Sequence, residues 1–243
     1  MSASPIDQFK IKIIGSDISI SGVNLSFTNA ALFMSITALL VIIFFYFLLK
    51  KTQIVPNKMQ MIAELSYDFV QGIAKDNLGD GGKKFFPFIY SIFMFFLFGN
   101  LIGLIPFSFA FTSHIAITVT IALLIFTVTT VYGFYKHGLS FFNLFVPSGI
   151  PIFLIPLMFV IEIISYIAKA LSMGIRLFAN VMSAHIIMEI ITGFIIAMGI
   201  FGIIPLAFTS VLFVLEFAVS CLQAYILTIL ACLFIQQAVE IQH

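Results

Sequence analysis

A long uncharged run extends from Phe85 to Tyr135, 51 residues without Asp, Glu, Lys or Arg. A helix needs about 20 apolar residues to cross a bilayer, so this run is too long for one span and suits a hairpin of two. Pro106 and His114 lie among the polar residues that mark the turn. Hydrophobic residues make up 62% of the 243 and charged residues 9%, which excludes an ordinary water-soluble domain with about 25% charged residues.

Further apolar runs lie on both sides of this hairpin. The predicted fold is all-α and polytopic, with about five membrane helices and one interfacial amphipathic helix in a single membrane domain, 1–243. Its segments are an N-terminal segment 1–29, a first span 30–49, an amphipathic helix 56–76, the hairpin 85–135, and long helices at 150–198 and 203–239. The last two exceed the roughly 30 Å hydrocarbon thickness, so we expect them to be strongly tilted.

The segment 56–76 differs from the spans because its apolar residues recur at helical spacing. Ile62, Leu65 and Phe69 are among them, while Glu64 and Lys75 belong to the polar side. This pattern is typical of a helix that lies on the membrane surface.

Lysines are concentrated between the first span and the hairpin. The six are Lys50, Lys51, Lys58, Lys75, Lys83 and Lys84. The positive-inside rule therefore predicts that this side faces the cytoplasm or matrix, with the N-terminus outside and the C-terminus inside. The net charge of +1 gives no indication of nucleic-acid binding, so we expect lipid and membrane proteins as partners.

Charges inside the last two apolar runs are the strongest functional signal. After Lys136 the charged residues are Glu162, Lys169, Arg176, Glu189, Glu216 and Glu240. A charge at the bilayer centre costs at least about 2.5–3.5 kcal/mol, so such residues usually face a partner or a water-filled path.

Arg176 is the sole arginine of the chain and lies in the middle of an apolar helix. Its guanidinium stays protonated at any accessible pH. At 100° per residue, Glu162 and Lys169 lie within about 40° of its direction, and Asn180 follows one turn later. A structurally paired or snorkelling arginine is the alternative interpretation.

A second set of polar residues lies nearer the other end of that helix and on the last helix. His185 and Glu189 are separated by one turn, and Glu216, Ser220 and Gln223 share one face of the last helix. If the two helices pack antiparallel, Glu216 comes near His185 and Gln223 near Arg176. A His/Glu pair in a hydrated cleft can relay protons, whereas a static interhelical hydrogen bond is the alternative.

Four segments together resemble the subunit a family of F-type ATP synthases. They are FGNLIGLIP (98–106), IEIIS (161–165), SMGIRLFANVMSAH (172–185) and LEFAVSCLQAY (215–225). The resemblance implies a non-catalytic stator subunit that forms two proton half-channels beside a ring of c subunits and couples proton translocation to ring rotation. It also implies a peripheral-stalk b-type subunit and other membrane-sector subunits as partners.

The resemblance also implies roles for individual residues. Arg176 faces the ring carboxylate, and His185 and Glu216 form the outer half-channel pair. Glu162 belongs to the inner half-channel, and Asn180 and Gln223 are polar neighbours of the arginine. Lys169 departs from the family pattern, and Ser165, Ser220, Lys169 and Glu189 are secondary candidates. The order of histidine and glutamate is typical of mitochondrial and alphaproteobacterial members, so we expect a mitochondrial inner membrane or an alphaproteobacterial plasma membrane.

Three other classes of protein compete with this interpretation. A proton-coupled secondary transporter also carries midplane charges but usually shows internal repeats, which this chain lacks. A structural scaffold has no need of an arginine in mid-helix, and no metal cluster, nucleophile motif or phosphate loop indicates an enzyme or a cofactor. We expect His114, His137 and His243 to be solvated loop residues, and Cys221 and Cys232 to be unbridged core residues.

Overall fold

The structure is a computed structural model of the chain. It describes residues 11–14, 19–20, 23–24, 26–50, 56–105, 108–146 and 151–239, the side chains of 19–20, 23–24, 47–50, 59, 80–82 and 152 excepted. Sequence-based assignments at Lys51, Pro106 and His243 lie outside these residues. The chain forms two compact units. Unit 1 comprises Met1–Ile54, Met94–Ile117 and Leu177–Ala224, and unit 2 comprises Val55–Phe93, Thr118–Arg176 and Tyr225–His243.

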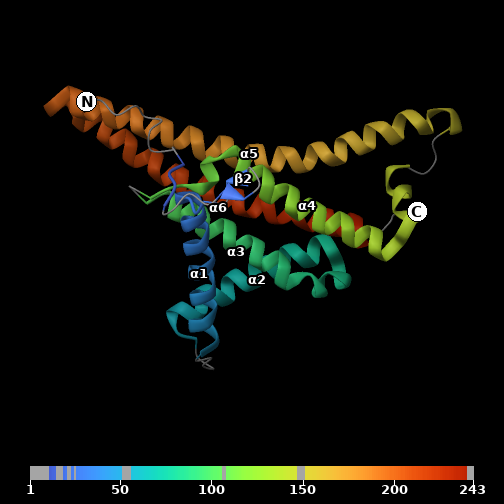
Figure 1. The fold of residues 1–243 in the computed structure, drawn as a ribbon. Helices are drawn as coiled ribbons and strands as arrows, with labels where there is room; N and C mark the ends of the chain where they lie inside the picture. Colours follow the sequence, from blue (N-terminus) through green and yellow to red (C-terminus); the bar gives the residue numbers. More distant parts are fainter. Residues whose placement is uncertain are drawn as a thin grey trace. The chain divides into compact units, whose positions relative to one another are not determined.

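Six α-helices account for most of the described residues (Figure 1). They are α1 (Asn29–Lys50), α2 (Lys58–Leu78), α3 (Phe86–Gly103), α4 (Ile115–His137), α5 (Ile155–Met198) and α6 (Ile203–Val239). In the part of the chain that the structure describes, four helical stretches are long and apolar enough to cross a membrane. They contain all of α3, α4, α5 and α6 and most of α1, and the last stretch includes both α5 and α6. The predicted all-α, polytopic membrane fold is confirmed.

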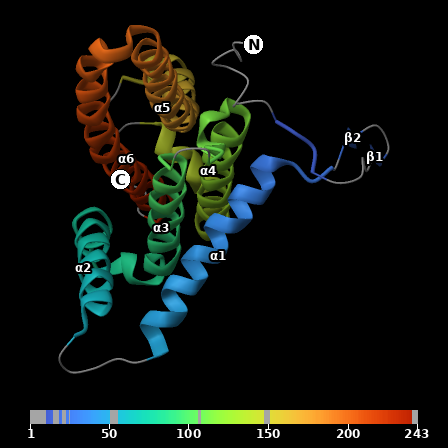
Figure 2. The same ribbon diagram turned by 90° about the vertical axis from the view of Figure 1, so that its left-hand side faces the viewer.

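The sequence-based assignment gave no strand, but a short antiparallel pair precedes α1. Strand β1 (Ser19–Ile20) pairs with β2 (Val23–Asn24), as the N-terminal part of Figure 2 shows. Asn29 then begins α1, and its side-chain oxygen accepts a hydrogen bond from the Ala30 N–H at 3.0 Å.

The hydrophobic core of unit 1 lies where the segment after α3 folds back onto α1. Phe109 and Phe111 are buried together with Ala30. Phe111 reaches α3 at Gly99, where a Cβ atom would stand 2.6 Å from the Phe111 ring. A glycine is therefore needed at this close approach.

The two loop histidines within the described residues are not simply solvated, so that expectation is wrong for both. His114 is partly buried and its ring stacks on Phe109 at a centroid distance of 5.0 Å. Burial lowers the pKa of His114 because desolvation penalises the charged imidazolium. His137 is the last residue of α4, and a ring nitrogen lies 3.2 Å from the Val239 carbonyl oxygen.

In unit 2, α2 has the predicted amphipathic character but divides its apolar residues between two environments. Val70 and Ile73 are buried, whereas Leu65 and Phe69 expose 61% and 49% of their surface. The Asn57 side chain accepts a hydrogen bond from the Lys58 N–H at the start of the helix. One part of the apolar arc packs on the protein, and the other is available to lipid or to a neighbouring chain.

The rest of the unit 2 core joins α4, α5 and α6. The Tyr166 ring lies 4.8 Å from that of Phe126 and 5.7 Å from that of Phe234, and its hydroxyl is 3.0 Å from the Thr130 hydroxyl. At Gly174 the backbones of α5 and α4 nearly touch, because a Cβ atom there would lie 2.7 Å from the Val119 Cα atom. The absence of a side chain at Gly174 thus determines how closely α5 can pack against α4.

The last two helices are as long as the sequence indicates, 44 residues in α5 and 37 in α6. These lengths correspond to about 66 and 55 Å. Between them the chain turns at Gly199, where φ is +55°, and at Gly202, where a Cβ atom would stand 2.6 Å from the Ile195 carbonyl oxygen. Their steep tilt in a bilayer stays a prediction.

Candidate functional site

The ten polar residues singled out in the sequence lie on α5 and α6, and they fall in both units. Unit 2 holds Glu162, Ser165, Lys169 and Arg176, and unit 1 holds Asn180, His185, Glu189, Glu216, Ser220 and Gln223. The expected approach of Gln223 to Arg176 would join the two units and stays a prediction.

Arg176 lies on an exposed face of α5 in unit 2. Lys169 on the same stripe is also exposed, and Glu162 is partly buried. Ala170 and Gly174, toward the other side of the helix, are buried. Packing within unit 2 therefore buries the side of α5 that carries Ala170 and Gly174 and leaves the Arg176 side chain exposed.

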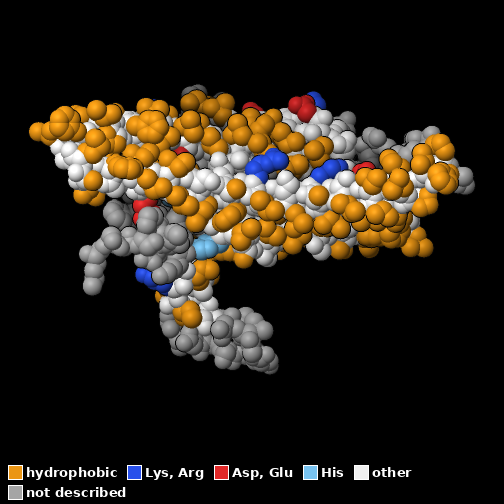
Figure 3. All heavy atoms as spheres, turned by 90° about the horizontal axis from the view of Figure 1, so that it is seen from above, with side chains coloured by type: hydrophobic (Ala, Val, Ile, Leu, Met, Phe, Trp, Pro, Cys, Tyr) orange, Lys and Arg blue, Asp and Glu red, His pale blue; other side chains and the backbone are white. Residues whose placement is uncertain are grey.

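Around Arg176 the exposed residues of α5 are Ser172 and Lys169 on the arginine's own side and isoleucines elsewhere on the helix. Ile167 and Ile175 expose 44% and 46% of their surface on this part of α5. Figure 3 shows isolated Lys and Arg side chains within a surface that consists mainly of hydrophobic side chains. A permanent charge in such surroundings needs a partner outside the described chain or a hydrated path, because an isolated charge in hydrocarbon is unfavourable.

On α6 the polar residues have the opposite environment. Glu216, Ser220 and Gln223 are buried, with 5%, 3% and 9% of their surface exposed. Their offsets of four and seven residues put them on one face of the helix. That face of α6 is therefore buried.

A cavity of about 190 Å³ lies beside Glu216, between the α5 and α6 segments of unit 1. Asn180, Ser183 and Ala184 line it from α5, and Val219 lines it from α6. The Glu216 Oε2 atom is buried and has no hydrogen-bond partner among the described residues. The space is large enough for water, which occupies about 30 Å³ per molecule in the liquid. Most of the lining is apolar, and its polar groups come from Asn180, Ser183 and Glu216. Water beside these groups can exchange a proton with the carboxyl.

His185 is partly buried in the same unit, as is Glu189. Neither is among the residues that line the cavity at Glu216. The cavity thus joins Glu216 to Asn180 and Ser183, and the functional pairing of His185 with Glu216 stays a prediction.

Asn100 on α3 is a site residue that the motif reasoning did not single out. It is buried, and its Nδ2 donates a hydrogen bond to the Ser220 carbonyl oxygen at 3.4 Å. Its Oδ1 atom is buried without a hydrogen-bond partner in the described part of the chain. The sequence feature that could have indicated Asn100 is its place as an asparagine inside a 51-residue uncharged run. Its position next to the buried face of α6 is evident only from the fold.

No group of three or more metal-ligating side chains occurs among the described residues. Cys221 and Cys232 are both free thiols, as the sequence predicted.

Comparisons with known proteins identify the family of the chain. Residues 31–236 match the family described as ATP synthase A chain. The chain is 46% identical to the ATP synthase subunit a of Pelagibacter ubique (strain HTCC1062), with full coverage of both chains. It is 43% identical to that of Rhizobium leguminosarum bv. trifolii (strain WSM2304), covering 99% of this chain and 98% of the relative, and 41% identical to that of Rhodospirillum rubrum, covering 98% of each. The chain therefore belongs to the ATP synthase A chain family.

Proposed function

We propose that the chain is the non-catalytic stator subunit of a rotary F-type ATP synthase. It forms two proton half-channels beside a ring of c subunits and couples proton translocation to rotation of that ring. Membership of the family implies a complex with other subunits. The observation that carries the proposal is the exposed position of Arg176 in the middle of an apolar helix.

The arginine needs an acidic partner because it cannot lose its proton. The helix around it is predominantly apolar in sequence, and the adjacent Ile175 is exposed. A carboxylate on a neighbouring membrane helix is the partner whose charge matches. Coulomb attraction favours the ionised form of that carboxylate while it faces Arg176, so the ring releases its proton before it reaches this position.

The outer half-channel is assigned to Glu216 and His185. The cavity beside Glu216, with Asn180 at its wall, supports a hydrated route inside unit 1. The Glu216 carboxyl receives a proton from water and passes it toward the ring carboxylate. Gln223 is assigned to the polar surroundings of the arginine.

The inner half-channel is assigned to Glu162, fourteen residues before Arg176 on α5. A proton that crosses 100 mV releases about 2.3 kcal/mol, and a static chain can use this free energy only if the proton is forced to detour. Arg176 closes the direct path, so each proton travels with the ring before it leaves near Glu162. Ser165, Ser220, Lys169 and Glu189 are secondary candidates along these paths.

We place the complex in the plasma membrane of a bacterium, because the relatives named above are bacterial. The N-terminus faces outside and the lysine-rich segment around α2 faces the cytoplasm. A b-type peripheral-stalk subunit and other membrane-sector subunits complete the partners.

Cysteine cross-linking tests whether the exposed face of α5 contacts the c subunit. Ser172 lies one turn before Arg176 and is exposed, whereas the adjacent Met173 exposes only 3% of its surface. With Cys221 and Cys232 replaced by alanine, Ser172→Cys should form a disulfide with a cysteine placed next to the c-subunit carboxylate. Met173→Cys is the matched control and should not. Equal cross-linking of the two, or none by Ser172→Cys, would contradict the proposed ring contact.

A further inference from the structure

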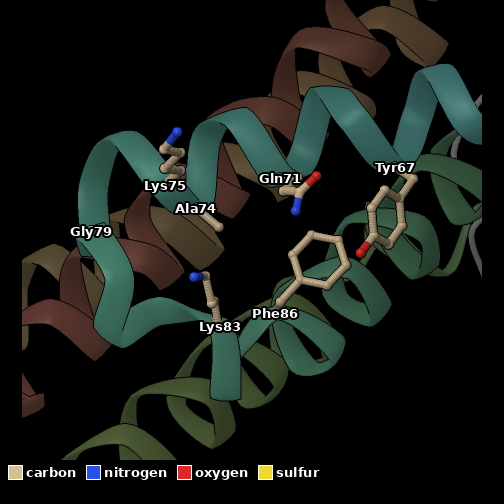
Figure 4. A pocket seen from close by; sticks show the side chains of 7 residues that line it. All are labelled: Tyr67, Gln71, Ala74, Lys75, Gly79, Lys83 and Phe86. Carbon is tan, nitrogen blue, oxygen red and sulfur yellow. The ribbon is translucent and has the colours of Figure 1, made fainter.

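A second cavity lies in unit 2, apart from the polar residues of α5 and α6. It has a volume of about 390 Å³ and lies between α2, the 3-10 helix η2 (Gly79–Lys84) and the start of α3. Its size falls within the range of small-molecule sites, about 300–1,000 Å³. Figure 4 shows its lining residues, which come from both sides of the turn after α2.

One end of the cavity is aromatic. The Tyr67 and Phe86 rings meet edge to face at a centroid distance of 4.7 Å, and Phe86 stacks on Tyr90 at 5.6 Å. The Tyr90 hydroxyl lies 2.8 Å from the Ser66 hydroxyl on α2. These contacts hold α2 against α3, so the aromatic wall is fixed before any ligand binds.

The other end of the cavity is cationic and polar. Lys83 and Gln71 lie across the space from each other, and Lys75 stands at the rim with its ammonium group turned outward (Figure 4). Two of the residues that line the cavity are lysines. This end therefore favours an anion.

Gly79 explains why the two ends belong to one cavity. Its φ of +56° lies in the left-handed region that favours glycine. Its N–H donates to the Lys75 carbonyl oxygen, which ends α2 there. The chain then folds back in η2 and brings Lys83 toward Gln71, so the fold holds the lysine at the cavity.

We propose that this cavity binds the phosphate headgroup of an anionic phospholipid such as phosphatidylglycerol. A lipid is favoured over other anions because the lining has both an ammonium end and an aromatic end, which match a phosphodiester and its glycerol and upper acyl chains. In addition, α2 exposes Leu65 and Phe69, as a helix at the membrane boundary does. Basic pockets on the cytoplasmic side are suited to anionic headgroups. This inference does not depend on the proposed proton path.

The test uses the intact complex that contains this chain, reconstituted in phosphatidylcholine vesicles. Two photoactivatable lipids with identical acyl chains, a phosphatidylglycerol and a phosphatidylcholine, each carry a diazirine next to the phosphate. After illumination, mass spectrometry maps the labelled peptides. The phosphatidylglycerol probe should label residues 67–86, and the phosphatidylcholine probe should label them much less.

Two neighbouring lysines supply a matched pair of variants. Lys83 and Lys84 are both exposed residues of η2, but only Lys83 lines the cavity. Lys83→Gln should reduce labelling of 67–86 by about fivefold, as expected for the loss of one lysine near an anionic surface. Lys84→Gln should leave it nearly unchanged, and neither exposed substitution should unfold the chain.

Several outcomes would overturn the proposal. Equal losses in Lys83→Gln and Lys84→Gln would show only a general attraction of the lysine-rich segment for anionic membranes. Equal labelling by the two lipids would show that the net negative charge of the headgroup has no role, because both lipids carry the phosphate. Complete suppression by inorganic phosphate would assign the site to a free anion. Absence of labelling because another subunit of the complex covers 67–86 would assign the cavity to a protein contact.

Discussion

Arg176 and Glu216 are both ionisable residues on long apolar helices, but one side chain is exposed and the other is buried. Arg176 is exposed on α5 in unit 2, on the same side as the exposed Ser172 and Lys169. Glu216 exposes only 5% of its surface on α6 in unit 1, beside a cavity of about 190 Å³.

The difference follows from the chemistry of the two groups. A carboxyl group can take up a proton and become neutral, so a chain can bury it next to a small, mainly apolar cavity. A guanidinium group cannot become neutral, so burial within one chain requires a permanent counter-charge. Glu216 is thus buried within its own chain, whereas Arg176 is left exposed, as the proposed contact with a neighbouring subunit requires.

The largest expected effect comes from removal of the arginine charge. Arg176→Ala should reduce proton-driven ATP synthesis below detection and leave a passive proton leak, because no fixed charge separates the half-channels. Arg176→Lys should restore little, since an ammonium differs in reach and can lose its proton when it is desolvated. Vesicles containing the complex, with an imposed proton gradient, report both ATP formation and gradient decay.

Ser172→Ala is the control for this experiment, because Ser172 is exposed one turn before Arg176 and is assigned to neither half-channel. It should retain most of the coupled synthesis. Near-normal synthesis by Arg176→Ala would refute the requirement for the permanent charge.

A smaller effect is expected from the buried carboxyl. Glu216→Gln preserves shape but cannot carry a proton, so the rate of proton uptake should fall by about a hundredfold. His185→Ala should also slow uptake, and exchange of the two residues should recover more activity than the single changes predict. The measurement is proton uptake by vesicles under an imposed potential. If the loss of proton-uptake rate in the exchanged variant equals the product of the losses in the two single variants, the residues are not coupled, which would contradict a relay between His185 and Glu216.

The smallest effect concerns the packing that presents Arg176. Gly174→Ala places a Cβ atom 2.7 Å from the Val119 Cα atom, so α5 must move away from α4. Overpacking of this kind costs about 1–3 kcal/mol. Thermal unfolding of the purified complex should therefore begin at a lower temperature.

Gly193 on the same helix is the matched control, because a Cβ atom at this position would have no heavy atom within 4 Å among the described residues. Gly193→Ala should therefore leave the unfolding temperature unchanged or raise it slightly, because alanine is the better helix former. If the two glycine variants behave alike, close packing of α5 on α4 does not determine how Arg176 is presented.

The helices themselves followed from the sequence because their length and composition reflect the bilayer. The apolar runs predicted the membrane spans, and the spacing of Ile62, Leu65 and Phe69 predicted the amphipathic α2. The short β1–β2 pair and the positions of His114 and His137 were not anticipated. The histidine positions depend on contacts with residues outside their own helix or loop, such as Phe109 and Val239.

The candidate site was predictable in part. The sequence alone shows an ionisable residue inside an apolar run, so Arg176 and Glu216 could be identified as candidate site residues from their neighbours in the sequence. Asn100 could not be linked to α6 in this way, because an uncharged side chain in a span has many possible neighbours. Its contact with the Ser220 carbonyl joins residues 120 positions apart.

The sequence by itself determined the class of the molecule and the positions of its unusual charges, since transfer to the membrane is governed by residue type and run length. Tertiary structure alone decided which of those charges became buried. Burial depends on the small residues and close helix contacts around each position, such as the approach of Gly174 to Val119 in unit 2. Helical periodicity gives the direction of a side chain along its own helix, but only packing determines whether protein, a cavity or an exposed surface lies in that direction.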